Sequence, residues 1–513
     1  MSTETLSSEI EGAQTKLVSA LGDDGRWRGG CRSRLFESGL TLHLFRRLNV
    51  QGAAPRKLAA YCREALAAPA PRWQGALERD LARLIATSAL GLPVTSEQAD
   101  RVKAALGGLE HHSRKRKHDF FLALLAELVP QVSWSPARAF DPGPYAHQWI
   151  TLIATSLRLL AADDADKAVP AAELTKAQGP DGSWQCHVPA TVIALLALST
   201  QDRNNPAVRS GLAFLVAQQR ADGGLPFIAD EDTWVTGLTT LTLLDSGLPP
   251  TLLAGAARYL ADQQLPSGGW GYSETVDQSD IDDTAVITLA LSRVPGHERA
   301  AERGAWHLLS LQNDDGGFPT FVRGAPSEVE ITAKCLRTLG AFTGTASAVA
   351  RGWRWLAGKQ RPDGGFSHEW SRSPAFPVLH VLRAAADLPP GYPEQVVSEI
   401  RGGCLRFLRD TAGSGGGWRY HRDESEVSLM VTSHAVAALG SLPDPPVELI
   451  EEALPWLSEQ GPAVADPDSL GPRPFVYDVP ILARVYRLAA LTSAHQVLAG
   501  TEARYSGFSL ERA

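Results

Sequence analysis

Apolar residues recur at every third or fourth position through most of the chain, which is the period of an amphipathic helix. Residues 190–200 (ATVIALLALST) and 283–294 (DTAVITLALSRV) are two apolar examples. Each is followed by a second helical stretch that leads to a glutamine, as in 206–219. Almost nothing alternates between apolar and polar residues as a half-buried strand does. The pattern predicts an all-α protein that is built from helical hairpins.

A turn motif of Gln, two variable residues, Asp or Ser, Gly, Gly or Ser, and a large apolar residue separates these hairpins. The copies are QGPDGSW (178–184), QRADGGL (219–225), QLPSGGW (264–270), QNDDGGF (312–318) and QRPDGGF (360–366), with a degenerate GSGGGW at 413–418. The Asp or Ser positions lie 41, 45, 48 and 48 residues apart, and a period of this size marks a repeat architecture. Six such hairpins can close into an (α/α)6 barrel, and an open solenoid is the alternative. We expect the Gln to cap a helix and the aromatic to pack on it, which favours closure.

The first third of the chain has a different character. One turn-like copy, LGDDGRW, stands at 21–27, and helical segments follow without the motif. The stretch DDADKAVP (163–170) has the composition of a linker. A length of 513 residues also exceeds one ordinary hydrophobic core. We therefore expect a helical domain over 1–165, whose first helix packs on the other domain, and a barrel over 166–513.

Composition narrows the function classes. Apolar residues make up 44% and charged residues 21% of the chain, as in ordinary globular proteins. A net charge of −8 gives no electrostatic case for binding nucleic acid. The sequence contains no run of about 18 apolar residues, so we expect no transmembrane segment. The polar start MSTETLSSEIEG does not resemble a secretory signal. The five cysteines show no metal-ligand spacing, which favours buried thiols in the cytoplasm.

Chemistry concentrates in residues 280–284, which read DIDDT at the start of the apolar helix 283–294. One Asp there is explained by N-capping. Three carboxylates within four residues repel each other, and an apolar cavity raises at least one pKa further. A carboxyl that stays protonated beside an apolar cavity is a general acid. Ca²⁺ binding and plain solvation of an acidic turn are the alternatives.

The chain resembles the class II terpene cyclases, which include squalene–hopene cyclases and bacterial copalyl diphosphate synthases. Their signature is Asp-x-Asp-Asp followed by Thr-Ala or Thr-Ser, together with repeated Gln-x-x-Asp-Gly-(Ser/Gly)-Trp/Phe turns. Here Asp280-Ile281-Asp282-Asp283-Thr284-Ala285 stands among five such turns. The segment 22–45 is similar to a worn form of the DGSWG region of diterpene cyclases, but the Asp-Arg-x-x-x-Thr-Leu-Ala that follows it there is not intact.

The resemblance implies a fold and a reaction. Family members have two α-barrel domains, β and γ, and we expect γ in the first third and β in the rest. The middle aspartate donates a proton to an alkene, so Asp282 is the expected acid and Asp280 and Asp283 tune it. The chain length is closest to bacterial enzymes that cyclise a C20 or C15 prenyl diphosphate, retain the diphosphate and use Mg²⁺. Geranylgeranyl diphosphate is the first expected substrate and farnesyl diphosphate the second, giving a bicyclic labdane- or drimane-type diphosphate.

Further groups are expected around the cavity. The quadrupole of an aromatic ring stabilises a cation, and core packing is the alternative for each ring. The candidates are Trp234, Tyr272, Phe321, Trp370, Phe376 and Tyr420. The basic run 111–120 offers Lys117, Arg114, Lys115 and Arg116 for the diphosphate, and Arg26, Arg28, Arg32 and Arg34 form a weaker set. Candidates to hold Mg²⁺ are Asp230, Glu231, Asp232 and Glu37; for the final base they are His380 and His421.

Other classes of protein share parts of this pattern. A class I terpene synthase would need an Asp-rich ionisation motif, and Asp163–Asp166 has no convincing partner motif. A protein prenyltransferase β subunit has a related barrel with a zinc site. A glycosidase of the (α/α)6 type needs two carboxylates across a polar groove, which the aliphatic helices disfavour. A helical scaffold without activity would tolerate Asp282→Asn.

Overall fold

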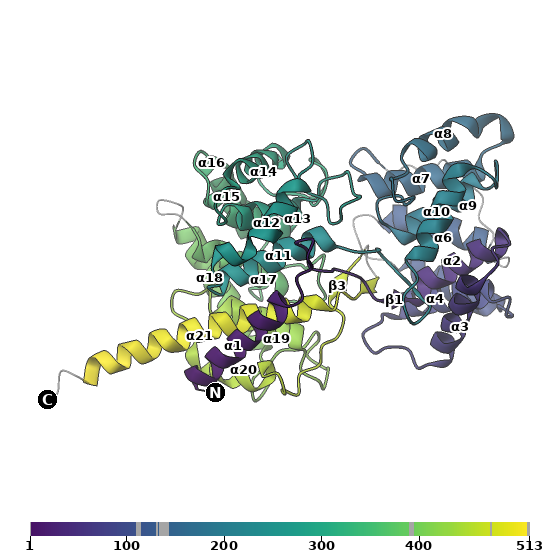
Figure 1. The fold of residues 1–513 in the computed structure, drawn as a ribbon. Helices are drawn as coiled ribbons and strands as arrows, with labels where there is room; N and C mark the ends of the chain where they lie inside the picture. The colour runs from purple at the N-terminus through teal and green to yellow at the C-terminus, as the bar shows by residue number, and fades with distance from the viewer. Residues whose placement is uncertain are drawn as a thin grey trace.

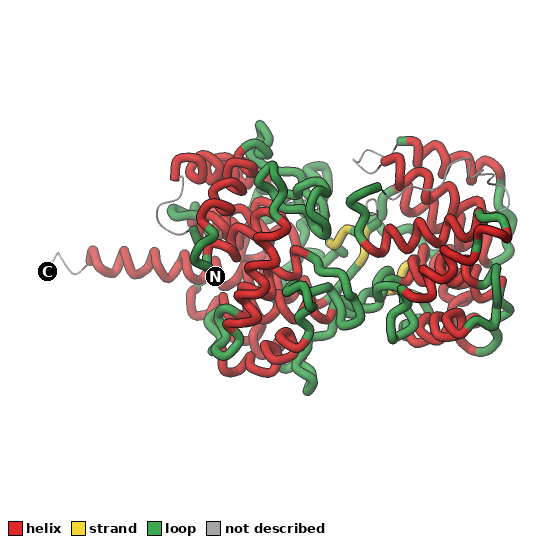
Figure 2. The backbone as a smooth tube through the Cα atoms, turned by 90° about the horizontal axis from the view of Figure 1, so that it is seen from above, coloured by secondary structure: helices red, strands yellow, loops and turns green. Residues whose placement is uncertain are grey.

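The computed structural model of the protein describes residues 2–108, 114–129, 132, 143–388, 394–471 and 475–509. Its helices gather in two bodies that stand beside each other and are joined by a narrow waist (Figure 1, Figure 2). The smaller body holds α2 (Leu35–Arg47), α3 (Ala53–Ala67), α4 (Ala76–Ala89), α5 (Ser96–Gly107), α6 (Arg114–Leu128), α7 (Gln148–Ala161), the 3₁₀ turn Asp164–Asp166, α8 (Ala168–Lys176), α9 (Val188–Leu198) and α10 (Pro206–Ala217).

The larger body is a closed double ring of helices. Its inner helices are α11 (Asp232–Asp245), α13 (Ile281–Leu291), α15 (Val329–Gly340), α17 (Phe376–Ala386), α19 (Leu429–Leu439) and α21 (Ile481–Ser509). Its outer helices are α1 (Thr3–Val18), α12 (Ala254–Asp262) after the 3₁₀ turn Pro250–Leu253, α14 (Glu298–Leu311), α16 (Ala346–Ala357), α18 (Glu394–Thr411) and α20 (Val447–Leu457). Each inner helix packs on the next, and α21 packs on α11 to close the ring. The expected all-α (α/α)6 barrel is confirmed.

Burial explains why two kinds of helix alternate. Inner helices such as α13 are buried along nearly their whole length, because both the barrel interior and the outer ring cover them. Outer helices such as α14 bury one stripe, with Ala301, Gly304 and Leu308 facing inward. This difference matches the two apolar patterns of the sequence, one continuous and one amphipathic.

The repeated turns tie each outer helix to the next hairpin by hydrogen bonds. In the turn before α13, the Trp270 indole donates to the carbonyl of Leu260, and the Trp270 backbone N–H donates to Thr284 Oγ1 at 3.0 Å. The Gln264 amide donates to the carbonyl of Ala300 in the next outer helix. Gly268 has φ +96°, and a Cβ there would lie 2.8 Å from the carbonyl oxygen of Arg303, so this position requires glycine.

The first repeat of the larger barrel is interrupted. Trp27, in the turn after α1, donates its indole N–H to the carbonyl of Leu17, as the other turns do. Its backbone N–H, however, donates to Thr236 of α11, 209 residues further along the chain. In the same way the Leu225 N–H after α10 donates to Ser38 of α2. Each turn is therefore completed by a helix that is far away in sequence.

Two chain crossings connect the bodies where this exchange takes place. β1 (Ser33–Arg34) leads into the smaller body and pairs antiparallel with β2 (Leu225–Pro226), which leads out of it. A second pair, β3 (Ser469–Leu470) with β4 (Val476–Tyr477), precedes α21. The smaller body is thus an insertion between α1 and α11 of the larger one (Figure 1).

Residue 165, the boundary expected from the sequence, lies between α7 and α8. Both α8 and α9 pack on α7, and α9 also packs on α2. The turns at 178–184 and 219–225 consequently belong to the smaller body, because the turn motif joins hairpins in both barrels and does not mark one of them. We propose instead that the boundaries lie in the two crossings, near residues 28–34 and 225–231. The first helix, α1, packs on α21 of the larger body.

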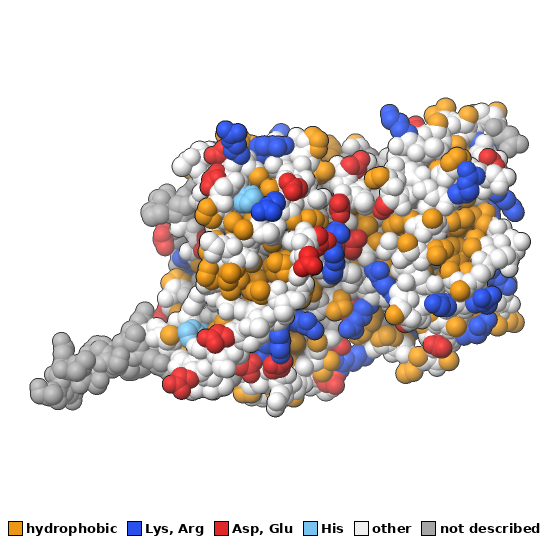
Figure 3. Space-filling view, in the orientation of Figure 1, with side chains coloured by type: hydrophobic (Ala, Val, Ile, Leu, Met, Phe, Trp, Pro, Cys, Tyr) orange, Lys and Arg blue, Asp and Glu red, His pale blue; other side chains and the backbone are white. Residues whose placement is uncertain are grey.

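The surface is mixed. Figure 3 shows Lys, Arg, Asp and Glu side chains interspersed with apolar ones over one face of both bodies. None of the helices in the described parts of the chain has the length and apolar character needed to cross a membrane.

Candidate active site

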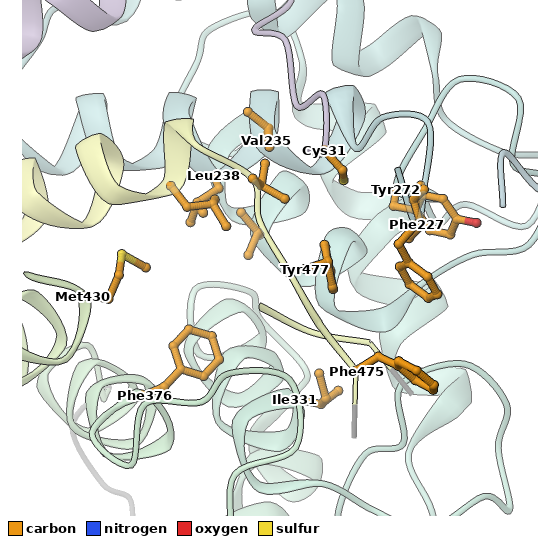
Figure 4. Packing of buried hydrophobic residues seen from close by; sticks show 14 of the residues in the cluster. Cys31, Phe227, Val235, Leu238, Tyr272, Ile331, Phe376, Met430, Phe475 and Tyr477 are labelled. Carbon is orange, nitrogen blue, oxygen red and sulfur yellow. The ribbon is translucent and has the colours of Figure 1, made fainter. Parts of the chain in front are cut away.

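A cavity lies beside the two crossings, at the N-terminal ends of α13, α15 and α17. It contains about 830 Å³ of space between its lining atoms, part of it open to solvent. Figure 4 shows Phe227 and Tyr272 at one side of this region, Phe376 at the other, and Tyr477 between them. The smaller body contributes Trp149 of α7 together with His187 and Phe227, so both bodies form the wall.

Three aspartates at the head of α13 line the cavity. Asp280 is the N-cap, and its Oδ1 accepts the backbone N–H of Asp282 at 2.8 Å. The Asp280 N–H donates to the carbonyl of Trp270, so the buried repeat turn fixes the position of this helix end. Asp283 Oδ2 has no hydrogen-bond partner among the described residues.

Burial shifts the pKa of two of these carboxyls in the same direction. Burial raises the pKa of Asp280 well above its usual range, and the charge of Asp282 adds to this shift. Burial raises the pKa of Asp283 in the same way, with further contributions from Asp280 and Asp282. The positive end of the helix favours anions, but it does not compensate for the loss of water around both groups. Both carboxyls therefore hold their protons to higher pH than an ordinary aspartic acid does.

The third carboxyl has a cationic partner. Lys334 of α15 places its Nζ 2.7 Å from both Oδ1 and Oδ2 of Asp282. The side chains are 5% and 13% exposed, so this ion pair is shielded from water. Nζ also lies 4.9 Å from the centre of the Phe376 ring. The site thus pairs Lys334 with Asp282, beside two carboxyls whose pKa is raised by burial.

Two further carboxyls line the cavity away from α13. Glu231 accepts a hydrogen bond from the Tyr477 hydroxyl at 2.9 Å, and burial raises its pKa to about 8. Asp468 accepts from the Ser371 hydroxyl at 2.5 Å, and burial raises its pKa to about 6. Neighbouring acids therefore differ in protonation at neutral pH, with Glu231 mostly neutral and Asp468 mostly ionised.

No model of a known protein family matches this chain. It is 33% identical over 502 residues to a drimenyl diphosphate synthase of Streptomyces showdoensis, covering 93% of both chains. It is 31% identical over 509 residues to a drimenyl diphosphate synthase of Streptantibioticus cattleyicolor, again covering 93% of both. The protein belongs to the class II terpene cyclases. Among solved structures, ent-copalyl diphosphate synthase from Streptomyces platensis is similar to this cyclase in fold, with a TM-score of 0.60, 18% identity, and coverage of 96% of this chain and 99% of that one.

Five of the six aromatic residues predicted from the sequence line the cavity of the cyclase. They are Trp234, Tyr272, Phe321, Trp370 and Phe376. Tyr420 is not among the lining residues; it is buried under the Arg372 guanidinium, 3.8 Å from the ring centre, and beside Asp468. The cavity is also lined by Trp149, Phe227, Tyr477 and Tyr486. They could not be predicted because they stand outside the repeated turns.

The predicted basic residues fall into two groups. Arg114, Lys115 and Arg116 form the first turn of α6, and their side chains lie outside the described residues. Lys117 follows them and is half-buried. In the weaker set, Arg28 pairs with Asp232 at 3.1 Å and Arg32 with Asp478 at 3.1 Å. The remaining two, Arg26 and Arg34, have carboxylate partners as well. Each arginine of the weaker set therefore already has a carboxylate partner within the protein.

The residues proposed for a resident magnesium ion do not fit one. Glu231 is bound to Tyr477, and Asp232 caps the Gly29 N–H at 2.7 Å. Glu37 is buried against Arg34, and Asp230 accepts from Ser273. Over the described ranges, no three His, Cys, Asp or Glu side chains come together as a metal site.

The two histidines suggested as the final base do not reach the cavity as lining residues. His380 is buried behind Phe376, with ring centres 4.5 Å apart, and burial lowers its pKa well below the usual value. His421 is exposed.

Lys334 is the functional candidate that the sequence did not reveal. The available sign was a lysine among the apolar residues that form α15, where burial of an unpaired ammonium is unfavourable.

Proposed function

We propose that this cyclase protonates farnesyl diphosphate and cyclises it to drimenyl diphosphate. The observation that carries the proposal is the aspartate triad on α13, which opens into a cavity with aromatic walls. The C15 substrate is placed ahead of the C20 one because both relatives that match 93% of the chain are drimenyl diphosphate synthases. Geranylgeranyl diphosphate, preferred from the sequence alone, is the second candidate.

In the proposed reaction Asp282 donates its proton to the terminal alkene. The O–H bond breaks, its electron pair stays on the carboxylate, and the alkene electrons form the new C–H bond. The resulting carbocation is attacked in turn by the next double bonds, forming two rings. Loss of a proton from the last cation restores an alkene, so substrate and product are isomers and the C–O bond to the diphosphate remains intact.

The aromatic walls suit this cationic chemistry. The rings that line the cavity offer faces whose quadrupoles attract a cation; they are Trp234, Tyr272, Phe321, Trp370 and Phe376. Burial of the carboxyls nearby also leaves few charged oxygens to capture the cation early. We propose that these rings guide the carbocation, which remains a prediction for each of them.

For the diphosphate we propose the start of α6, with Lys117, Arg114, Lys115 and Arg116. Phe121 lies one turn further along α6, and its ring centre is 5.3 Å from that of Phe475. Phe475 stands two residues before Tyr477, which lines the cavity. The N-terminal end of a helix also favours an anion. Mg²⁺ is proposed to arrive as the counter-ion of the diphosphate. A cytoplasmic location fits five cysteines that are all buried and unpaired.

Substitution of the acid tests the function. Purified protein is incubated with farnesyl or geranylgeranyl diphosphate, with Mg²⁺ or with EDTA, and the alcohols released by phosphatase are identified by mass spectrometry. We expect a bicyclic C15 alcohol, and a loss of turnover in Asp282→Asn of at least about 10³-fold, because the proton donor is removed.

The matched control is Asp262→Asn, which makes the same chemical change at an exposed position on α12. Full turnover by Asp282→Asn with an intact circular dichroism spectrum would exclude Asp282 as the acid. A bicyclic product from the C20 substrate alone would reverse the order of the two substrates.

A further inference from the structure

We propose that Lys334 is a positioning residue that sets the acid strength of Asp282, through the ion pair that forms when the proton leaves. The inference rests on the proposed role of Asp282 as donor and deepens it. An alkene is a weak base, so its protonation requires an acid whose conjugate base is strongly stabilised. A cation in contact with both carboxylate oxygens supplies that stabilisation.

The geometry is that of a fixed partner. Lys334 Nζ stands 2.7 Å from each Asp282 oxygen, within the range of charge-assisted hydrogen bonds. The lysine side chain is 5% exposed, so water scarcely screens the attraction. The Phe376 ring, 4.9 Å from Nζ, lies along the cavity side of the ammonium. The lysine thus faces the acid and is covered by an aromatic ring.

Groups that face this pair come from every neighbouring inner element. They are Asp280 and Asp283 on α13, Glu231 before α11, Cys335 on α15, His380 on α17, His434 on α19 and Tyr486 on α21. Burial raises the pKa of the acidic groups and lowers that of the histidines, to about 3 for His434. Arg383 on α17 also acts on both histidines, and its own counter-charges are Asp245 and Asp387.

Lys334 is therefore the group on α15 that places a cation in direct contact with the proton donor. Before donation, a neutral Asp282 carboxyl lies beside the ammonium. After donation, the electron pair of the broken O–H bond remains on an oxygen that Lys334 already contacts. Because Nζ already lies 2.7 Å from both carboxyl oxygens, little movement is needed to stabilise the carboxylate. The proton lost from the last carbocation balances the one donated.

Lys334→Met tests the inference because methionine keeps the length of the side chain and removes its charge. Without the ammonium the Asp282 carboxyl is a weaker acid, so we expect kcat to fall about 100-fold, while KM changes less than about threefold. A weaker acid also keeps its proton to higher pH. The alkaline limb of the kcat profile is therefore expected to move up by about one pH unit or more.

Two further variants separate this role from a structural one. Lys334→Arg keeps the cation and is expected to retain the position of the alkaline limb and most of the turnover. Lys359→Met is the matched control, since Lys359 lies 5.0 Å over the Trp355 ring but is exposed and outside the cavity. It is expected to behave as the unchanged protein.

A Lys334→Met enzyme with an unshifted limb and kcat within about threefold of the parent overturns the inference, although the proposed function would stand. If Lys334→Met does not fold, the test rests on Lys334→Arg. Low turnover of Lys334→Arg, together with a displaced alkaline limb of its kcat profile, also overturns the inference. Failure of the unsubstituted protein to cyclise either substrate would instead defeat the proposed function.

Discussion

At the scale of single residues, buried carboxyls dominate the cyclase site. Asp280, Asp282 and Asp283 are close in sequence, so their acidic cluster could be predicted from the chain. The chain could not show which of them has a cationic partner, because Lys334 is 52 residues from Asp282 and no local pattern marks it. Tyr420 was placed at the cavity for its position in a repeat, but a turn residue can pack behind the wall as easily as line it.

Glu231 gives a prediction for stability against pH. Its usual pKa is 4.5 and burial raises it to about 8 in the folded protein. Between these values the folded state keeps a proton that the unfolded chain releases, so stability falls as pH rises from about 4.5 to about 8. Glu231→Gln removes this contribution. We therefore compare the midpoint of the variant minus that of the parent at two pH values. This difference is expected to be ~3–5 °C larger at pH 8 than at pH 5.

The measurement is a melting curve at each pH, with Glu302→Gln as a control at an exposed site on α14. Parallel midpoint curves for Glu231→Gln and the parent would mean that Glu231 does not titrate in this window.

At the scale of elements, the turn before each inner helix holds the head of that helix in place. The motif could be predicted because the same Gln, Gly and aromatic positions recur, and the hydrogen bonds explain why those residue types are needed. Only the turn at Trp270 precedes the aspartate triad, whereas the turn at Trp418 precedes α19 and makes the same bonds. The two turns therefore have equal structural roles but different positions relative to the chemistry.

Thr284→Val and Thr432→Val form a matched pair that tests this difference. Each removes the hydroxyl that accepts the backbone N–H of a buried tryptophan, at 3.0 Å for Thr284 and 2.9 Å for Thr432. An unpaired buried N–H costs about 1–3 kcal/mol, so both thermal midpoints should fall by similar amounts. We expect kcat to fall at least about tenfold in Thr284→Val only. Equal loss of kcat in both variants would show that the effect is one of general stability.

At the scale of the whole molecule, the two barrels share one interrupted chain. The domain boundary could not be read from the sequence, because Trp27 and Thr236 join one repeat across 209 residues and no local feature announces the link. The boundary that we expected rested on the linker-like composition of 163–170, and α7 and α8 pack together across this stretch. The helical hairpins followed from the helical period, two domains from the length of the chain, and the two-barrel plan from the family resemblance.

Removal of residues 1–18 tests the role of α1 in the larger barrel. This helix buries Leu6, Ala13 and Leu17 and packs on α21, and the Leu17 carbonyl accepts the Trp27 indole N–H. Without it the outer ring is open at one place. We expect calorimetry to show the transition of the larger body at least ~5 °C lower, with that of the smaller body unchanged. A deletion that lowers both transitions equally would contradict the insertion.

The interrupted repeat also imposes an order on synthesis. α1 is synthesised long before its partners, because α11, which completes its turn, begins at residue 232, and α21, on which it packs, begins at residue 481. The smaller barrel is continuous in sequence, so it can assemble while the rest is still being made. Until α21 has been released from the ribosome, the apolar face of α1 remains without the helix on which it packs. Chaperone demand during translation should therefore arise mainly from the larger barrel, whose helices α1 and α21 can pack together only after the smaller body has been synthesised.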